Sequence, residues 1–469
     1  MVIALLAAGC LTGGSFGVAA GSLLVVAVGL PFLRRLRRDG LDPPAVYVLM
    51  TVITFGLMSG IWLTARPFTA PPGLGRDDVA HALLLVSVGV AAFCLGARLL
   101  GPAQPRKPLV MDAEASPQAT FLLLLFGVSA GALLIGLVIG ATGYTAALDR
   151  SPALAASSQL IVQLGAIGPM AILAAALTCF ATPERRFRRL VPLLLAVQAL
   201  VGFASGFKGQ SVIPFIFVGL AFIACRGRVP WRPVVVLGAV VVIVLLPANA
   251  VYRATLRPAV GVERDNSPRA LVRDAYIYGS SRFRYIDHVA LIEARTPSLY
   301  EYGSGARYVW LPALVAVPRV IWSAKPILDD GLEFSHTYWD IPLAIKTSTP
   351  LTQIGDLYRN FAWPGVIAGL AVWGLVVAAF GAACRRWRSP RTEMVLIYAL
   401  VTAVPYVESD LPQLIAAATR SLPVAAACAW LLLPGRGGAQ PGYRRVLVGF
   451  RALRAKAFPG YASPATEEL

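Results

Sequence analysis

Long apolar stretches without charged residues dominate the chain and predict membrane-spanning helices. A helix needs about 17 to 25 residues to cross ~30 Å of hydrocarbon. The expected spans are residues 1–33, 43–65, 78–98, 118–141, 156–181, 190–207, 209–225, 233–252, 360–384, 393–408 and 412–433. Their apolar runs are continuous rather than alternating, which excludes a membrane β-barrel. The predicted fold class is an all-α polytopic membrane protein with about 11 transmembrane helices, the last two spans being the weakest.

The distribution of Lys and Arg predicts the orientation of these spans. Basic residues collect in cytoplasmic loops, so the cluster at 34–38 places the loop after the first span in the cytoplasm. Alternation then assigns to the same side the segments 98–118, 182–189, 226–232, 385–392 and the tail from 434. These segments carry 24 basic residues, and the short outer loops carry five. We expect a plasma-membrane protein with its N-terminus outside and its C-terminus in the cytoplasm.

Composition narrows the class of protein further. Hydrophobic residues make up 57% of the chain and charged residues 14%, with a mean hydropathy of +0.68. These values exclude a soluble enzyme, a secreted disulfide scaffold and a disordered protein. Basic residues in the cytoplasmic loops of a protein embedded in the lipid bilayer explain the net charge of +18. No nucleic-acid partner is therefore expected. The six cysteines lie in or beside apolar spans, and neither a zinc signature nor a nucleotide motif occurs. No metal and no cofactor is predicted.

Residues 253–359 differ from the rest of the chain. They are nearly neutral and rich in Tyr, Trp, Pro and Gly, and their one apolar stretch, 308–322, is short and interrupted by Pro. A loop of this length is usually functional, so we expect a folded extracytoplasmic loop with short surface helices and the active site. The predicted organisation is eight spans in 1–252, this loop in 253–359, the C-terminal spans in 360–433, and a basic cytoplasmic tail in 434–469.

The run from Arg282 to His288 places two cations, an acid and a histidine within seven residues. Arg282 and Arg284 are candidate contacts for an anionic substrate, and Asp287 is a candidate for proton transfer. The same composition is typical of a solvated amphipathic helix, and the run alone favours that structural role.

A second pair of cations, Arg319 and Lys325, lies between prolines with Trp322 between them. Trp is common at the depth of lipid head groups, and Arg binds phosphate oxygens in a bidentate fork. These residues are candidate ligands for a pyrophosphate or another head group. The alternative is that both long side chains merely reach the membrane surface.

Hydroxyl, amide and aromatic side chains precede the ninth predicted span. Thr347, Thr349, Asp356, Tyr358 and Asn360 offer the donors, acceptors and stacking surfaces that a sugar needs. Thr and Ser also cap helices, and the two roles are compatible.

Two further cations lie in or near the predicted membrane region. Lys208 sits at the tip between two apolar runs that barely cross, and Arg420 lies ~12 Å inside the last span. A charge in the membrane is costly and marks a functional candidate. Lys208 and Arg420 could line an outward-open pocket for a lipid diphosphate. The alternatives are an ordinary loop lysine, and an ion pair of Arg420 with Glu408 or Asp410.

Four of these segments form a recognisable set. They are the tip Gly206…Lys208-Gly209, the run Pro318-Arg319…Trp322…Lys325-Pro326, the Thr/Ser cluster at 347–349, and Gly355-Asp356-Leu357-Tyr358-Arg359-Asn360-Phe361…Gly365. Over about residues 200–385 the chain resembles bacterial oligosaccharide repeat-unit polymerases, the O-antigen polymerase-like proteins. It departs from their pattern at Lys208, where Arg is frequent, at Asp356, where Glu is common, and at Ala362, where Gly is common. The last departure could alter the backbone near Asn360.

The resemblance implies a metal-independent membrane glycosyltransferase of the C-type class. Its substrate would be a polyprenyl-diphosphate-linked oligosaccharide at the outer leaflet, with a chain-length regulator as an additional partner. Lys208, Arg282, Arg319 and Arg420 would neutralise the leaving diphosphate. The base that takes the acceptor proton would be Asp356 first, His336 second and Asp287 third.

Three other functions remain open at this point. A ligase of the same architecture would pass finished glycan to another acceptor. A transferase using a polyprenyl-phosphate sugar would use acids of the first outer loop, here Asp77 and Asp78, although acids also stabilise a helix N-terminus. A non-enzymatic transporter of lipid-linked glycan would place polar groups at the bilayer midplane, whereas here they gather in one loop.

Overall fold

The structure is a computed structural model in which every regular element of the described residues is a helix. It describes residues 1–64, 71, 73–101, 106–111, 117–140, 161, 163–182, 184–206, 208–240, 244–245, 248, 252, 267, 269–270, 284–317, 322, 330–343, 348–435 and 441–442. Nine helices in this part of the chain are long and apolar enough to cross a membrane. The all-α fold class is therefore confirmed and is consistent with a polytopic membrane protein.

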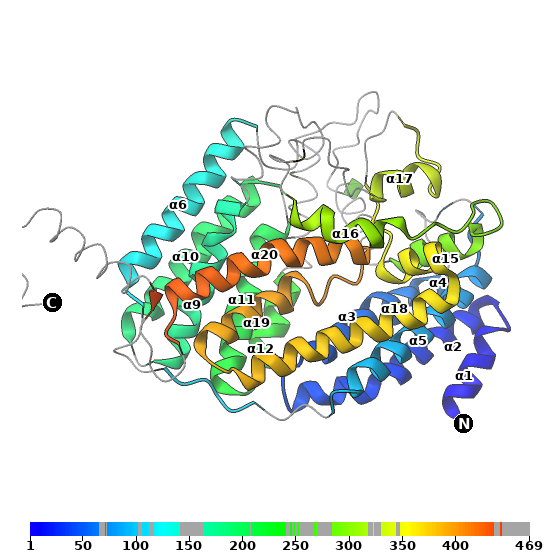
Figure 1. Cartoon of the computed structure of the whole chain (residues 1–469), viewed down its shortest axis with the longest axis horizontal. Coiled ribbons are helices and arrows are strands. Elements are labelled where there is room, and N and C mark those ends of the chain that lie inside the picture. The colour runs from blue at the N-terminus through cyan, green and yellow to red at the C-terminus, as the bar shows by residue number, and fades with distance from the viewer. Residues whose placement is uncertain are drawn as a thin grey trace, which may run out of the picture.

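The helices follow the chain in an order that Figure 1 shows by colour. The first half contains α1 (Val2–Cys10), α2 (Gly14–Leu33), η1 (Arg34–Arg37), α3 (Pro43–Thr51), η2 (Val52–Leu57), η3 (Met58–Gly60), α4 (Ile61–Thr64), α5 (Arg76–Arg98), α6 (Ala119–Val138), α9 (Ile167–Ala181), α10 (Arg185–Ala204) and α11 (Lys208–Arg226). The second half contains α12 (Trp231–Val240), α15 (Ile286–Arg295), α16 (Ala306–Ala316), α17 (Asp330–Thr337), α18 (Gln353–Arg386), α19 (Pro390–Thr402) and α20 (Leu411–Leu432).

Three expected spans differ from the helices that form. The stretch 1–33 divides into α1 and α2 at Gly13, whose φ of +70° turns the chain between them. The stretch 393–408 forms only the 13-residue α19, which is too short to span by itself and is buried against α9, α11 and α20. Of the stretch 233–252, the structure describes mainly its first part, in α12.

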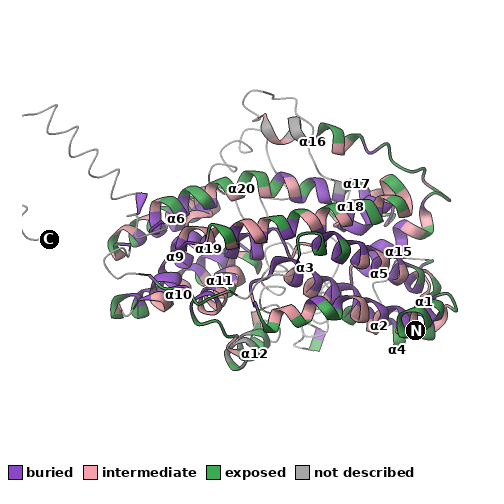
Figure 2. Ribbon diagram, turned by 60° about the horizontal axis from the view of Figure 1, so that its bottom comes forward, coloured by how far each residue is buried: buried purple, intermediate pink, exposed green. Residues whose placement is uncertain are grey.

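The close contact between α5 and α18 holds the centre of the fold together. A Cβ atom at Gly96 would lie 1.9 Å from the carbonyl oxygen of Ala371, and one at Gly374 would lie 2.1 Å from that of Phe93. Helices that share a low-dielectric environment associate through small residues that let their backbones touch. Of the nine candidate spans in the described residues α5 is the most enclosed, and in Figure 2 it is mainly in the colour of buried residues, whereas α20 shows many exposed residues.

Buried ion pairs tie several loops together at one end of the bundle. Arg106 Nε lies 3.0 Å from Asp39 Oδ2, and its Nη1 lies 3.1 Å from Glu393 Oε1. Arg385 Nη1 lies 3.4 Å from Asp42 Oδ1. These residues come from loops that alternation assigns to a single side, so the structure brings the predicted cytoplasmic loops together at one end.

At the opposite end, the start of α2 contacts the start of α5, and α4 contacts α15 of the predicted loop. Gly14 N donates to Asp77 Oδ1 at 2.6 Å, and Trp62 Nε1 donates to Asp287 Oδ1 at 2.9 Å. The short helices α15 and α17 lie near the first turns of α18 (Figure 1). The loop residues therefore gather where α2 and α5 begin and α4 ends.

We expect Gly96→Ala to lower stability by about 1–3 kcal/mol, because the added methyl group forces the backbones of α5 and α18 apart. Gly127→Ala on α6 is the matched control, since a Cβ there meets nothing within 4 Å, and Ala favours a helix over Gly. Thermal unfolding of both variants in detergent measures the difference. Equal midpoints for the two variants would contradict a tight α5–α18 contact.

Candidate active site

The first turns of α18 carry the central residues of the site. Thr352 Oγ1 accepts a hydrogen bond from Gly355 N at 3.0 Å and caps the helix. Thr352 N donates to Glu408 O at 2.9 Å, which fixes this end against the loop before α20. At Ala362 the backbone leaves the helical region, with φ 55° and ψ −154°. The segment before this kink is thus a separate, polar part of α18, and the predicted span 360–384 corresponds closely to the part after it.

Asp356 lies on this polar segment and is 1% exposed. Tyr308 Oη donates to its Oδ2 at 2.5 Å, and Asn360 Nδ2 donates to its Oδ1 at 3.1 Å. Burial and the neighbouring carboxylate raise the pKa of Tyr308 above its usual range, so the phenol keeps its proton. Because both oxygens of Asp356 accept hydrogen bonds, the carboxylate orients Tyr308 and Asn360.

Asn360 also binds the chain that leads into α16. Its Oδ1 accepts from Gly305 N at 3.3 Å, and Gly303 N donates to Arg359 O at 2.9 Å. Gly305 has a φ of +63°, which favours Gly over residues with a side chain. These bonds hold the chain before α16 against the first turns of α18.

Two arginines that the sequence analysis did not select converge on Glu333. Arg307 Nη2 lies 2.9 Å from Glu333 Oε2, and Arg359 Nη1 lies 3.7 Å from Glu333 Oε1. Glu333 is 53% exposed, so the pair opens to the surface at this carboxylate and at Arg307, whereas the side chain of Arg359 is 11% exposed. Burial raises the pKa of Asp410, and both guanidinium groups act against that rise, which places them close to the buried acids as well.

Sequence reasoning had one signal for this pair. Arg359 lies inside the run Gly355–Gly365 and one helical turn after Asp356, whereas Arg307 stands alone before an apolar stretch. Only the folding of α16 against α18 brings the two together.

His336 lies on α17, one turn after Glu333, so both side chains share a helical face. Its Nδ1 lies 2.7 Å from Ile341 O. A carbonyl oxygen only accepts, so Nδ1 of the neutral ring carries the proton and Nε2 keeps its lone pair. Thr349 Oγ1 accepts from Ser335 Oγ at 2.7 Å and Thr349 N donates to Gly331 O at 3.0 Å, which hold α17 in place.

Asp287 belongs to a different cluster, on α15. Its Oδ1 accepts from Trp62, and its Oδ2 lies 3.2 Å from Arg284 Nη1. Burial raises the pKa of Asp287 to about 6, although Arg284 and Trp62 act to lower it. Both residues are almost completely buried; the ion pair lies within the start of α15, and the hydrogen bond from Trp62 joins α15 to α4.

The remaining predicted site residues are not brought together with Asp356 by any described contact. Tyr358 stacks edge-on with Tyr302 at 6.1 Å between ring centroids. Arg420 is exposed, and its Nε donates to Ala416 O of its own helix at 2.9 Å. Trp322 is half-buried. The residues Arg282, Arg319, Lys325 and Thr347, and the side chain of Lys208, lie outside the described residues.

Within the described part of the chain, no group of three or more His, Cys, Asp or Glu side chains is arranged to hold a metal ion. Comparison with known protein families, with curated proteins and with solved structures finds no significant match to this chain. The function therefore has to be argued from the chemistry of the site.

Glu293 on α15 is a further acid that sequence reasoning missed. Burial, together with the charge of Asp78, raises the pKa of Glu293 to about 7, and its Oε2 makes no hydrogen bond in the described residues. Only the fold brings Glu293 to the start of α5, since the two acids are far apart in sequence.

Glu293 should make stability depend on pH. Because its pKa is higher in the folded than in the unfolded chain, stability falls as pH rises from about 4.5 to about 7 and then levels off. We expect Glu293→Gln to unfold at a higher temperature than the parent protein at pH 8, with a smaller gain at pH 5. Melting curves at both pH values measure this difference, and a gain that is independent of pH would contradict it.

Ala362 should carry backbone strain. The region near φ 55° and ψ −154° is nearly restricted to Gly and costs other residues about 1–3 kcal/mol. We expect Ala362→Gly to raise the free energy of unfolding by about 1 kcal/mol, whereas Ala368→Gly, in the regular helix after the kink, should lower it by a similar amount. Chemical unfolding in detergent measures both. A loss of stability in Ala362→Gly equal to that in Ala368→Gly would show that position 362 is unstrained.

Proposed function

We propose that the protein is a membrane glycosyltransferase that joins polyprenyl-diphosphate-linked oligosaccharide repeat units into a polysaccharide. The observation that carries this proposal is the convergence of Arg307 and Arg359 on one open surface, beside Asp356 and Asn360. Paired guanidinium groups suit a diphosphate because each forms a bidentate fork with phosphate oxygens. The resemblance of the run Gly355–Gly365 to repeat-unit polymerases supports the same assignment.

The reaction needs charge stabilisation and one proton acceptor. An acceptor hydroxyl attacks the anomeric carbon of the donor glycan, the bond from that carbon to the diphosphate oxygen breaks, and the polyprenyl diphosphate leaves. Arg307 and Arg359 stabilise the negative charge that grows on the diphosphate. His336 accepts the hydroxyl proton at Nε2, because its Nδ1 is fixed as a donor by Ile341 O.

Asp356 has a positioning role in this proposal. Its two oxygens hold Tyr308 and Asn360, and Asn360 lies next to Arg359 in the chain. The Asn360 amide donates both N–H groups to Asp356 and accepts from Gly305 N, so it fixes the backbone that carries Arg359. This favours His336 over Asp356 as the base.

The basic residues at the opposite end of the helix bundle support a site that faces the outer side of the membrane. The predicted cytoplasmic loops, with Arg106 and Arg385, lie at the end opposite Trp62 and Asp287. Basic loops favour the cytoplasmic side, so the site faces the outer leaflet, where we expect lipid-linked repeats to be joined. The proposed location is a bacterial plasma membrane.

Arg359→Gln should reduce polymer formation by about 100-fold or more, because loss of one group that stabilises transition-state charge typically costs 10²–10³ in rate. Arg295→Gln is the matched control, since Arg295 pairs with Asp340 at 2.9 Å in the same predicted loop and does not contact Glu333. Both variants are compared in a deletion strain by sizing surface and lipid-linked glycan at equal protein level. Polymer of normal length and amount from Arg359→Gln would refute the assignment.

The deletion strain also identifies the acceptor class. A polymerase defect leaves single repeats on the carrier, whereas loss of a ligase leaves long chains on it. Long lipid-linked chains in the deletion strain would overturn the polymerase assignment.

A further inference from the structure

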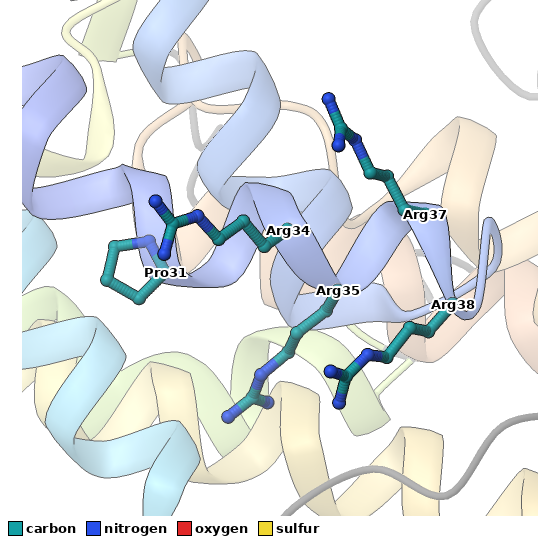
Figure 3. Close-up of a pocket in the computed structure, with 5 residues that line it drawn as sticks. All are labelled: Pro31, Arg34, Arg35, Arg37 and Arg38. Atoms are coloured by element: carbon teal, nitrogen blue, oxygen red, sulfur yellow. The ribbon is translucent and has the colours of Figure 1, made fainter.

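A pocket of about 490 Å³ opens at the end of α2, away from the proposed active site. Its lining is Pro31, Arg34, Arg35, Arg37 and Arg38, which Figure 3 draws as sticks. The α2 helix ends at Leu33 and tightens into the 3₁₀ turn η1. Figure 3 shows Arg34 reaching back toward the ring of Pro31, Arg35 and Arg38 extending to one side of this turn, and Arg37 extending to the opposite side.

One of the four arginines is anchored. The guanidinium carbon of Arg35 lies 3.9 Å from the centre of the Phe32 ring, and its Nη1 lies 4.0 Å from Asp42 Oδ2. The guanidinium carbon of Arg98, on α5, lies 5.7 Å from the centre of the same ring. A cation–π contact and an ion pair therefore hold the Arg35 side chain in place in the lining of the pocket.

The other three arginines have no acidic partner among the described residues. In the described residues Arg34, Arg37 and Arg38 form no ion pair or side-chain hydrogen bond. The nearby acids are already engaged, because Asp39 pairs with Arg106 and Asp42 with Arg385. An uncompensated positive pocket of this kind favours a ligand with at least one phosphate group.

The surface beside the pocket indicates that this ligand also has acyl chains. Leu23 and Leu30 are 58% and 43% exposed and lie seven residues apart on one face of α2. Arg34 follows Leu30 by four residues and continues that face into the pocket. A molecule with a phosphate head and apolar tails would contact both parts, whereas free phosphate would contact only the arginines.

We propose that this pocket binds an anionic phospholipid, with its phosphate between the arginines and an acyl chain along Leu30 and Leu23. The basic loops predict that this end is cytoplasmic, so the lipid comes from the inner leaflet, where basic pockets between helices bind anionic head groups. The site is separate from the glycan site, and the proposal is independent of the proposed function.

The test titrates delipidated full-length protein in detergent with dioleoylphosphatidylglycerol and counts bound lipid by native mass spectrometry. We expect the triple variant Arg34→Gln/Arg37→Gln/Arg38→Gln to bind this lipid with an apparent dissociation constant at least about tenfold higher than that of the parent protein. The control Arg185→Gln/Arg188→Gln/Arg189→Gln removes the same charge from the exposed start of α10 and should bind like the parent. If the triple variant does not fold, Arg38→Gln alone is compared with Arg188→Gln.

Two comparison ligands separate a lipid from other sources of charge. Dioleoylphosphatidylcholine should bind at least about tenfold more weakly to the parent, and inorganic phosphate should not compete at millimolar concentration. Equal binding of both lipids, equal loss in the two triple variants, or full competition by inorganic phosphate would overturn the proposal.

Discussion

The contact between α5 and α18 is the constraint on which the rest of the molecule depends. Gly96 and Gly374 let the two backbones touch, and neither position has room for a side chain. Asp77 of α5 also accepts a hydrogen bond from the start of α2, at Gly14. The α5 helix packs against α15, which in turn is bonded to α4 through Trp62. The position of α18, and of the polar segment at its start, is therefore set by a close contact with α5 that extends from Gly374 to Ile354.

The site is held by hydrogen bonds that connect elements distant in sequence. Thr352 fixes the start of α18 to the loop before α20, and Asn360 fixes the chain before α16 to α18. The kink at Ala362 then turns the long apolar helix away from this segment. The polar segment thus faces the short helices α16 and α17, while the same helix continues as an apolar span.

Hydropathy and charge predicted the helical class and most of the long helices, because a run of apolar residues is a local property of the chain. The same reasoning did not predict that helix forms over only part of 393–408, as α19, since a short helix buried among neighbours has the same composition as one exposed to lipid. It selected Asp356 and Asn360 from their density of polar groups but missed Arg307, Arg359 and Glu293. The partners of Arg307 and Glu293 lie on other helices, so no local pattern in the sequence marks these two, whereas Arg359 lies inside the run Gly355–Gly365. The unusual residue at 362 was visible in the sequence, and only the backbone angles show what it does.

The exposed carboxylate of Glu333 gives the arginine pair a built-in counterion. Any incoming anion has to compete with a charge that is tethered to the same surface and is always present at high local concentration. A singly charged molecule gains little from this exchange, whereas one with several negative oxygens can engage both guanidinium groups at once. Such an arrangement discriminates between ligands by their number of negative charges, and Glu333 neutralises part of the positive charge of the two arginines.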